Sequence, residues 1–252
     1  MSPFRLATTG AILVVSMATA AVGPVCTAAS GRDTLPLVEL YTSEGCDSCP
    51  PVDRWLTATF PARDTSASVL AFHVDYWDRL GWKDRFASAD YTARQYASMR
   101  ARGATFVYTP QVLVQGRDVD AARRLRAVDA ARVHPARATI SMEAEGIDVR
   151  VRAGIPDRRA RRHGALWVAY TDSGLVSDVK AGENRGVQLR HDHVVRALYG
   201  PFPISEDGEA SAAFAATQPA ERGRNAALVA FVQDRTTGEV LQTLTMPICK
   251  AP

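Results

Sequence analysis

The sequence predicts an α/β domain, with a central mixed sheet flanked by helices, followed by an all-β, sandwich-like domain. In the first half, short apolar runs alternate with segments whose apolar residues recur at helical spacing, which is typical of β-α-β units. In the second half, apolar and polar residues alternate one by one, which is typical of antiparallel strands with one buried face. The composition, 46% hydrophobic and 23% charged residues, fits a globular chain long enough for two modest domains.

The first half is expected to follow the order β-α-β-α-β-β-α. Its expected elements are strands at 37–41, 69–74 and 105–116, the last interrupted by Pro110, and helices after Cys49, after Ser88 or Asp90, and from Asp120 to about Arg132. The helix starts are indicated by capping side chains and the breaks by proline and glycine.

The second half is expected to be a small β-sandwich of short strands. A hairpin is indicated where Ile140–Ala144 and Ile147–Val151 flank Glu145-Gly146. Further strands are expected at 166–170, 194–198, 227–232 and 240–245. With a boundary near His134-Pro135, the predicted domains are residues 34–133 and 136–248.

The charge distribution argues against one class of partner. The chain has 30 basic and 27 acidic residues, a formal net charge of +3, and these residues are scattered along its length. A nucleic-acid partner is not expected, because no concentrated basic surface is evident. We expect no cofactor either.

Residues 1–29 are expected to contain an export signal. Arg5 supplies the positive start, residues 6–22 are apolar and small, and Ala18-Thr19-Ala20 is a cleavage site, with cleavage near Ala29 as the alternative. The predicted location is the periplasm or the extracellular space. No membrane span is expected in the mature chain, because no later segment reaches about 20 uninterrupted apolar residues.

Export affects the interpretation of the four cysteines, because disulfides persist in oxidising compartments. If cleavage follows Ala20, Cys26 and Cys249 lie near opposite ends of the mature chain and could form a structural disulfide, since domain termini often meet. If cleavage falls near Ala29, Cys26 is removed and Cys249 is left unpaired. Both alternatives are compatible with the sequence.

The segment Cys46-Asp47-Ser48-Cys49 lies between the first expected strand and the first expected helix. Two thiols at this spacing can close as a reversible disulfide. The helix N-terminus favours a thiolate, so Cys46 is the expected nucleophile and Cys49 the resolving thiol. Glu44 and Asp47 disfavour the thiolate, which predicts a moderately acidic thiol rather than a very acidic one.

Two motifs together resemble the thioredoxin fold: the Cys46-x-x-Cys49 pair, and Thr109-Pro110 leading into Gln111–Gly116, which is similar to the thioredoxin cis-proline loop and its following strand. More narrowly, four segments resemble the secreted bacterial family of domain of unknown function 1223 (DUF1223), over about Leu37 to Met246. They are Glu39–Cys46, His73–Trp77, Gly81–Asp84 and Gly182–Gly186.

The resemblance implies a thioredoxin-like domain with a family-specific C-terminal part and no established substrate. It also implies that a cis Thr109–Pro110 bond would bring the Thr109 backbone beside Cys46. With a one-residue offset, Glu39 would match the buried acid of thioredoxin that helps to deprotonate the resolving thiol.

His191 and His193 are weak candidates for a metal site. At a spacing of two they would share a strand face, where Glu183 could join them as a copper or zinc ligand. Two histidines do not complete a tetrahedral ligand set, so a solvated or hydrogen-bonded loop is the favoured interpretation and no metal is predicted.

The sequence therefore predicts an exported thiol-disulfide oxidoreductase in which Cys46, Cys49, Thr109 and Pro110 form the site. Its expected partners are periplasmic protein thiols or disulfides and a protein that recycles the cysteine pair. Two alternatives remain: a non-catalytic thioredoxin-fold binding module with a structural Cys46–Cys49 disulfide, and a periplasmic metal-binding protein.

Overall fold

The computed structural model describes residues 25–216, 223 and 225–249. Most of the predicted export signal, residues 1–24, lies outside the described residues. No helix among the described residues is long and apolar enough to cross a membrane.

Strands dominate the fold. The strands are β1 (Val25–Ala29), β2 (Leu37–Thr42), β3 (Ser68–His73), β4 (Gln111–Val114), β5 (Arg117–Asp118), β6 (Thr139–Glu145), β7 (Asp148–Gly154), β8 (Gly164–Ser173), β9 (Leu175–Asp178), β10 (Gln188–His191), β11 (Val194–Pro203), β12 (Glu209–Ala215), β13 (Asn225–Asp234) and β14 (Val240–Pro247). The helices are α1 (Pro50–Thr59), the 3-10 helix η1 (Asp75–Leu80), α2 (Ala89–Ala101), α3 (Arg124–Arg132) and α4 (Arg158–Arg161).

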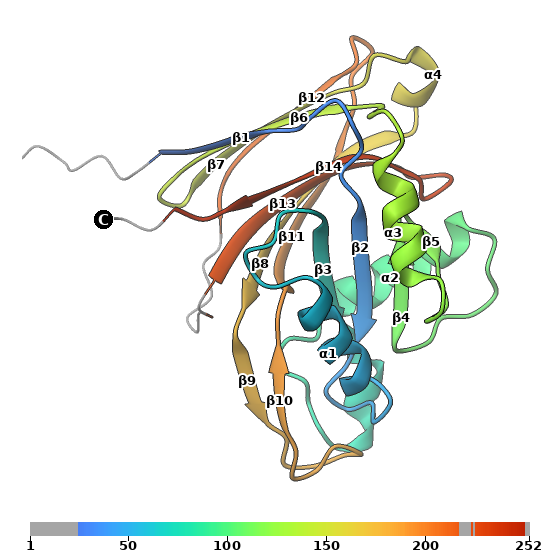
Figure 1. Ribbon diagram of the computed structural model, residues 1–252, viewed down its shortest axis with the longest axis vertical. Helices are drawn as coiled ribbons and strands as arrows, with labels where there is room; N and C mark the ends of the chain where they lie inside the picture. Colours follow the sequence, from blue (N-terminus) through green and yellow to red (C-terminus); the bar gives the residue numbers. More distant parts are fainter. Residues whose placement is uncertain (1–24, 217–222, 224, 250–252) are drawn as a thin grey trace, which may run out of the picture.

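The largest element is an eight-stranded mixed sheet in the order β14-β13-β8-β11-β3-β2-β4-β5 (Figure 1). β3 pairs in parallel with β2 and with β11, and the other pairs are antiparallel. The β3–β11 contact is short: Val194 lies opposite Ala71, and the Ala71 N–H donates to the His193 carbonyl at 2.8 Å. Strands from the first and second halves of the chain therefore form one sheet.

This arrangement shows that the predicted fold class, a helix-flanked α/β thioredoxin-like domain followed by a separate sandwich, is wrong. The structure is mostly β, with 42% strand and 19% helix, and its sheets are large. The physical reason lies in β3, whose six residues are all buried. Such a strand needs hydrogen-bonding neighbours on both edges, and β11, from the second half, takes the edge opposite β2. The domain bounds 34–133 and 136–248 stay a prediction.

Both faces of the eight-stranded sheet are apolar. One face carries Tyr41, Phe72 and Phe231 in a single buried cluster that extends from β2 to β13 and includes Tyr91 of α2. On the opposite face, Leu40 and other residues of β2, β3 and β4 form a cluster with side chains of α1 and α3. The alternation of side chains along each strand explains how neighbouring residues serve different clusters.

The rest of that opposite face is covered by a second, four-stranded antiparallel sheet in the order β1-β6-β7-β12. Its inward residues, such as Met142 and Val151, share a buried cluster with Leu166, Leu228 and Met246 of the eight-stranded sheet. β6 and β7 alternate strictly between exposed and buried residues, the pattern of strands with one solvated face.

Local sequence signals set the helix starts. Pro50 and Pro51 occupy the first turn of α1, where the missing N–H has no intrahelical acceptor to lose. The Ser88 side chain accepts from the Asp90 N–H and caps α2, one of the two caps expected from the sequence. Asp157 caps the short α4 in the same way.

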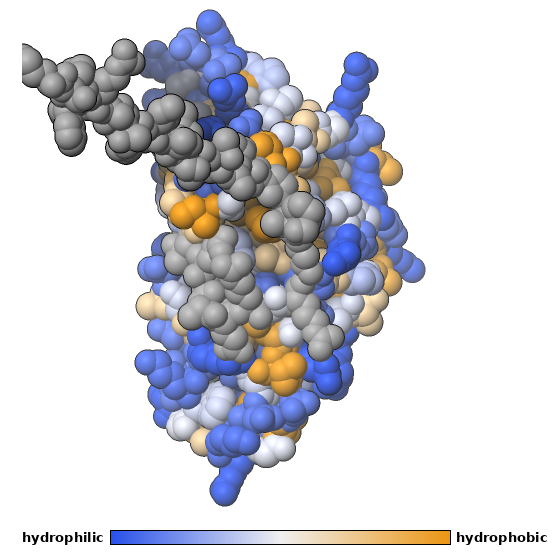
Figure 2. Space-filling view, turned by 90° about the vertical axis from the view of Figure 1, so that its left-hand side faces the viewer, coloured by the Kyte–Doolittle hydropathy of each residue, from blue (hydrophilic) through white to orange (hydrophobic). Residues whose placement is uncertain are grey.

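The face on the left of Figure 1 is largely hydrophilic where described residues are visible, with hydrophobic residues in small separate patches (Figure 2). This is the usual surface of a protein that keeps its apolar residues in a core.

Two disulfides close loops of very different length. Cys26 is joined to Cys249 at a sequence separation of 223, and Cys46 to Cys49 at a separation of 3. In the chain-entropy model, loop closure contributes about 5 kcal/mol for the long loop and about 2 kcal/mol for the short one. The Cys26–Cys249 disulfide joins β1 to the segment after β14 and so links one edge of the four-stranded sheet to one edge of the eight-stranded sheet.

We expect the double variant Cys26→Ser/Cys249→Ser to lower the free energy of unfolding by about 5 kcal/mol, since the unfolded chain regains the freedom of the long loop. The measurement is denaturant unfolding under non-reducing conditions. Cys46→Ser/Cys49→Ser is the matched control, with an expected loss nearer 2 kcal/mol. Equal losses of unfolding free energy in the two double variants would show that Cys26–Cys249 does not stabilise the fold more than Cys46–Cys49.

Candidate functional site

The candidate site is the loop that joins β2 to α1. Both of its cysteines are buried, with an exposed fraction of 0% for Cys46 and for Cys49, whereas Asp47 and Ser48 between them are exposed. Cys49 is the N-cap residue of α1, and its carbonyl accepts from the Asp53 N–H at 3.1 Å. The cysteine pair therefore lies at the positive end of the helix dipole.

The loop is held from the second half of the chain. The Asn184 side-chain amide donates to the carbonyls of Glu44 and Cys46, both at 2.9 Å, and Glu183 accepts from the Asp47 N–H at 3.1 Å. These residues lie between β9 and β10, a two-stranded arm that extends beside α1 (Figure 1). Three backbone groups at or near Cys46 are thus held by one loop of this arm.

A buried carboxylate lies under the cysteine loop. Glu44 is fully buried. Its Oε2 accepts from Trp82 Nε1 at 2.8 Å, and its Oε1 lies 3.1 Å from His191 Nε2. Burial alone would raise the pKa of Glu44, but these hydrogen bonds lower it, and the net shift is downward. Gly182 makes room for this contact, because its Cα approaches Trp82 so closely that an added Cβ would lie 3.2 Å from the Trp82 Cβ.

A second buried pair adjoins the first. His73 Nδ1 lies 2.6 Å from Asp84 Oδ2, which also accepts from the Glu44 N–H at 2.9 Å. Burial opposes both charges, but their mutual attraction dominates, so the pKa of His73 is raised and the pKa of Asp84 is lowered. The rings of His73 and His191 are 5.0 Å apart, centroid to centroid. Glu44, His73, Asp84 and His191 therefore form one buried cluster of ionisable side chains.

Asp53, on the first turn of α1, connects this cluster to the helix that follows the cysteines. Its carboxylate accepts from the Thr42 hydroxyl at 3.2 Å. Burial raises the pKa of Asp53, while the charges of His191 and His73 act in the opposite direction and only partly offset it.

The proline loop reaches the same end of the sheet. The Thr109–Pro110 bond is cis, the isomer expected from the sequence. Gln111 pairs with Tyr41 near the end of β2, a few residues before Cys46. Trp77 of η1 bridges the two loops: its Nε1 donates to the Thr109 hydroxyl at 2.8 Å, and its Cβ lies against Gly45.

Glu39 is not part of this cluster. It lies on the α2 face of β2, where Arg94 donates to its carboxylate at 2.7 Å, whereas α1 packs on the opposite face. The arginine is itself stacked near Phe72 and Phe231. Glu39 is therefore engaged in a buried ion pair on the face away from the helix that follows the cysteines.

The three weak metal candidates have separate partners. His191 bonds to Glu44, Glu183 to the Asp47 backbone, and His193 Nε2 donates to the Phe60 carbonyl at 2.7 Å. Burial lowers the pKa of His193 and keeps it neutral. Across the described residues, no group of three or more His, Cys, Asp or Glu side chains is arranged to hold a metal ion.

Sequence reasoning from spacing alone missed the buried cluster. His73 ends an apolar run, whereas Glu44 and Asp84 lie among polar residues or glycine; each of the three lies in one of the segments that resemble DUF1223. These segments are far apart in the sequence, and in the folded chain they meet at the cysteine loop.

Together, the fold and the site define a β-rich protein in which the Cys46–Cys49 disulfide lies next to a buried cluster of carboxylates and histidines. The family model "Protein of unknown function (DUF1223)" matches residues 37–233. The chain belongs to this family.

Two solved structures are similar to the chain. A crystal structure of the Agrobacterium tumefaciens protein AGR_C_4864 is 26% identical, with a TM-score of 0.63, and the match covers 86% of this chain and 96% of that one. HBP35 of Porphyromonas gingivalis is 12% identical, also with a TM-score of 0.63, covering 88% of this chain and 77% of that one, which shows a shared fold alone. No curated protein matches the chain.

We expect Asp84→Asn to destabilise the protein by about 3–5 kcal/mol, because it leaves His73 without its buried partner. A raised histidine pKa stabilises the fold below the unfolded value of 6.5 and ceases to do so as the pH rises through the folded value. A lowered aspartate pKa stabilises above the unfolded value of 3.8 and ceases to do so as the pH falls through the folded value. The loss should therefore be largest between about pH 4 and 6.5.

The measurement is denaturant unfolding at pH 3, 5.5 and 9. Asp129→Asn is the control, because Asp129 is an exposed acid 3.7 Å from Arg132 and its removal should change stability by less than about 1 kcal/mol at every pH. A pH-independent loss in Asp84→Asn would show that the cluster is held by packing rather than by charge.

Proposed function

We propose that this protein is an exported thiol-disulfide oxidoreductase that acts through Cys46 and Cys49. The observation that carries the proposal is the position of this disulfide: it closes a loop of sequence separation 3 at the N-terminus of α1. That position favours the thiolate of the reduced form, which is the reactive species. Disulfides in the chain suggest an oxidising compartment, in agreement with export.

As a purely structural bond, this disulfide would add little to the stability of the fold. Its loop closure contributes only about 2 kcal/mol. The same loop is already held by two hydrogen bonds donated by Asn184 and one accepted by Glu183. A bond that can open without unfolding its surroundings is suited to exchange.

The exchange balances as two thiol-disulfide steps. The Cys46 thiolate attacks a substrate disulfide, forms a mixed disulfide and releases one substrate thiolate, which takes up a proton. The Cys49 thiolate then attacks Cys46 Sγ, closes the Cys46–Cys49 bond and releases the second substrate thiol. Two electrons pass from the cysteine pair to the substrate, and a recycling partner must return them; the reverse steps oxidise a dithiol.

The buried state of both sulfurs favours a second candidate, a static disulfide in a non-catalytic binding module. Cys46 and Cys49 have no exposed surface in this conformation. Under the first proposal, the cover over them must move for a thiol to reach Cys46. Trp77 is the best candidate for that cover, because it contacts Gly45 and is tied to Thr109.

The reduction potential of the pair separates the two candidates. We expect a value above about −300 mV, the range of exchangeable rather than structural disulfides. The full chain is equilibrated in dithiol redox buffers, the free thiols are alkylated, and peptide mass mapping resolves each disulfide, with Cys26–Cys249 as internal comparison. A value well below about −300 mV would assign Cys46–Cys49 a structural role.

Removing the cover should speed reduction. We expect Trp77→Ala to increase the rate at which dithiothreitol reduces Cys46–Cys49 several-fold, since an attacking thiolate must reach a sulfur directly. Trp55→Ala is the control, because Trp55 packs against Phe60 on α1 and its loss tests general loosening of the helix. An equal increase in the reduction rate in both variants would show that Trp77 does not specifically shield the disulfide.

A further inference from the structure

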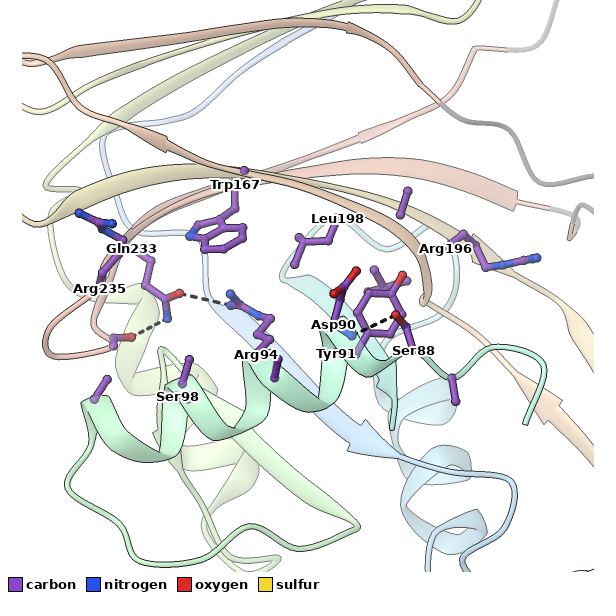
Figure 3. A pocket seen from close by; sticks show the side chains of 18 of the residues that line it. Ser88, Asp90, Tyr91, Arg94, Ser98, Trp167, Arg196, Leu198, Gln233 and Arg235 are labelled. Atoms are coloured by element: carbon purple, nitrogen blue, oxygen red, sulfur yellow. Dashed lines mark hydrogen bonds between the residues drawn. The ribbon is translucent and has the colours of Figure 1, made fainter. Parts of the chain in front are cut away.

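A groove of about 860 Å³ lies between α2 and the face formed by β8, β11 and β13 (Figure 3). Trp167 and Leu198 line it from the sheet, and Tyr91 lines it from the helix. None of the described residues 43–49 contributes to this lining. The groove is therefore separate from the cysteine site, and the groups that act on the Cys46 sulfur come from the cysteine loop and from the segments packed on it.

The backbone of the cysteine loop supplies no direct hydrogen bond to the Cys46 sulfur. Most of its N–H groups already donate to oxygen atoms, namely those of Glu44, Gly45, Cys46, Asp47 and Cys49. The remaining one, the N–H of Ser48, makes no hydrogen bond to this sulfur in the described part of the chain. A thiolate at Cys46 would have to be stabilised by another donor.

The start of α1 does not supply that donor either. A helix usually leaves its first four N–H groups free for an anion. Here Pro50 and Pro51 have no N–H, and the N–H groups of Val52 and Asp53 donate to the Cys49 carbonyl at 2.9 and 3.1 Å. The helix therefore acts on Cys46 through the field of its dipole and not through a hydrogen bond.

A side-chain donor does reach the sulfur. The Ser48 Oγ lies 3.3 Å from Cys46 Sγ. A disulfide sulfur carries no hydrogen, so the serine hydroxyl is the donor in this contact. Ser48 is exposed, whereas Cys46 has no exposed surface, so the hydroxyl reaches the buried sulfur from the surface of the protein.

The charged groups around the loop make such a donor valuable. Acids come from the loop itself, from α1 and from the β9–β10 arm: Glu44, Asp47, Asp53 and Glu183. The buried histidines His73 and His191 are each paired with a carboxylate, of Asp84 and Glu44 respectively. The basic residues next to these acids in sequence form no ion pair with them in the part of the chain that the structure describes: Arg54, Lys83 and Arg185. Nearby carboxylates oppose a thiolate, and a neutral hydroxyl bonded to the sulfur counteracts them.

We propose that the Ser48 hydroxyl stabilises the thiolate of reduced Cys46 by donating a hydrogen bond to its Sγ. A hydrogen bond to an anion is about twice as strong as one to a neutral acceptor, so the hydroxyl favours the thiolate over both the thiol and the disulfide. Ser48 thereby raises the fraction of Cys46 that can attack a substrate disulfide at a given pH. This inference rests on the proposed function, because only a reducible pair forms a thiolate.

The test measures the pH dependence of Cys46 alkylation in the full chain. A Cys49→Ser background keeps Cys46 reduced, iodoacetamide is the probe, and peptide mass mapping follows the Cys46 peptide alone. The pH midpoint of the alkylation rate gives the pKa of this thiol, independently of how accessible the sulfur is. We expect Ser48→Ala to raise the midpoint by about one unit, the effect of losing one hydrogen bond to a charged group.

Ser48→Thr is the matched control, because threonine keeps the hydroxyl at an exposed position, and it should leave the midpoint unchanged. Equal midpoints in the parent protein and Ser48→Ala would overturn the inference. So would an equal rise in Ser48→Ala and Ser48→Thr, since the effect would then come from the shape of the side chain. A wild-type reduction potential well below about −300 mV would instead overturn the proposed function, whatever the midpoints show.

Discussion

The short parallel contact between β3 and β11 is the interaction on which the rest of the structure depends. It consists of one residue pair, Val194 opposite Ala71, and the adjacent hydrogen bond to the His193 carbonyl. Without it, the strands of the first half would end in an unpaired, fully buried edge, which is costly for backbone groups that have no water to bond. With it, the apolar faces of both halves become continuous, and the core clusters extend across the whole sheet.

The same contact determines where the candidate site forms. β10 ends at His191, immediately before β11, so fixing β11 beside β3 brings His191 next to His73 at the end of β3. The arm that β10 forms with β9 then carries Asn184 to the cysteine loop. Residues 147 positions apart, Glu44 and His191, thus meet because one strand pair aligns them.

Much of the local structure could be predicted from the sequence, because its signals are local. Apolar runs predicted β2 and β3 to within a residue or two, and Ser88 is a helix cap. The turn between β6 and β7 is Gly146-Ile147, one residue from the predicted Glu145-Gly146. The pairing of strands could not be predicted in this way. A fully apolar run such as 68–73 shows that both faces are buried, but it does not identify the strand that will occupy each edge. The site was predicted in part for the same reason: Cys46 and Cys49 are neighbours in sequence, whereas the partners of Glu44 come from β10 and from the segment after η1.

The Cys26–Cys249 disulfide, together with the backbone, makes almost the entire described chain a closed covalent ring. A protease that cuts an exposed loop anywhere between the two cysteines opens this ring but releases no fragment, because the pieces stay joined through the sulfurs. The pieces of a cleaved molecule therefore stay at high effective concentration relative to one another and can retain their fold. In an oxidising compartment, where this disulfide persists, the fold can therefore tolerate a single backbone cut.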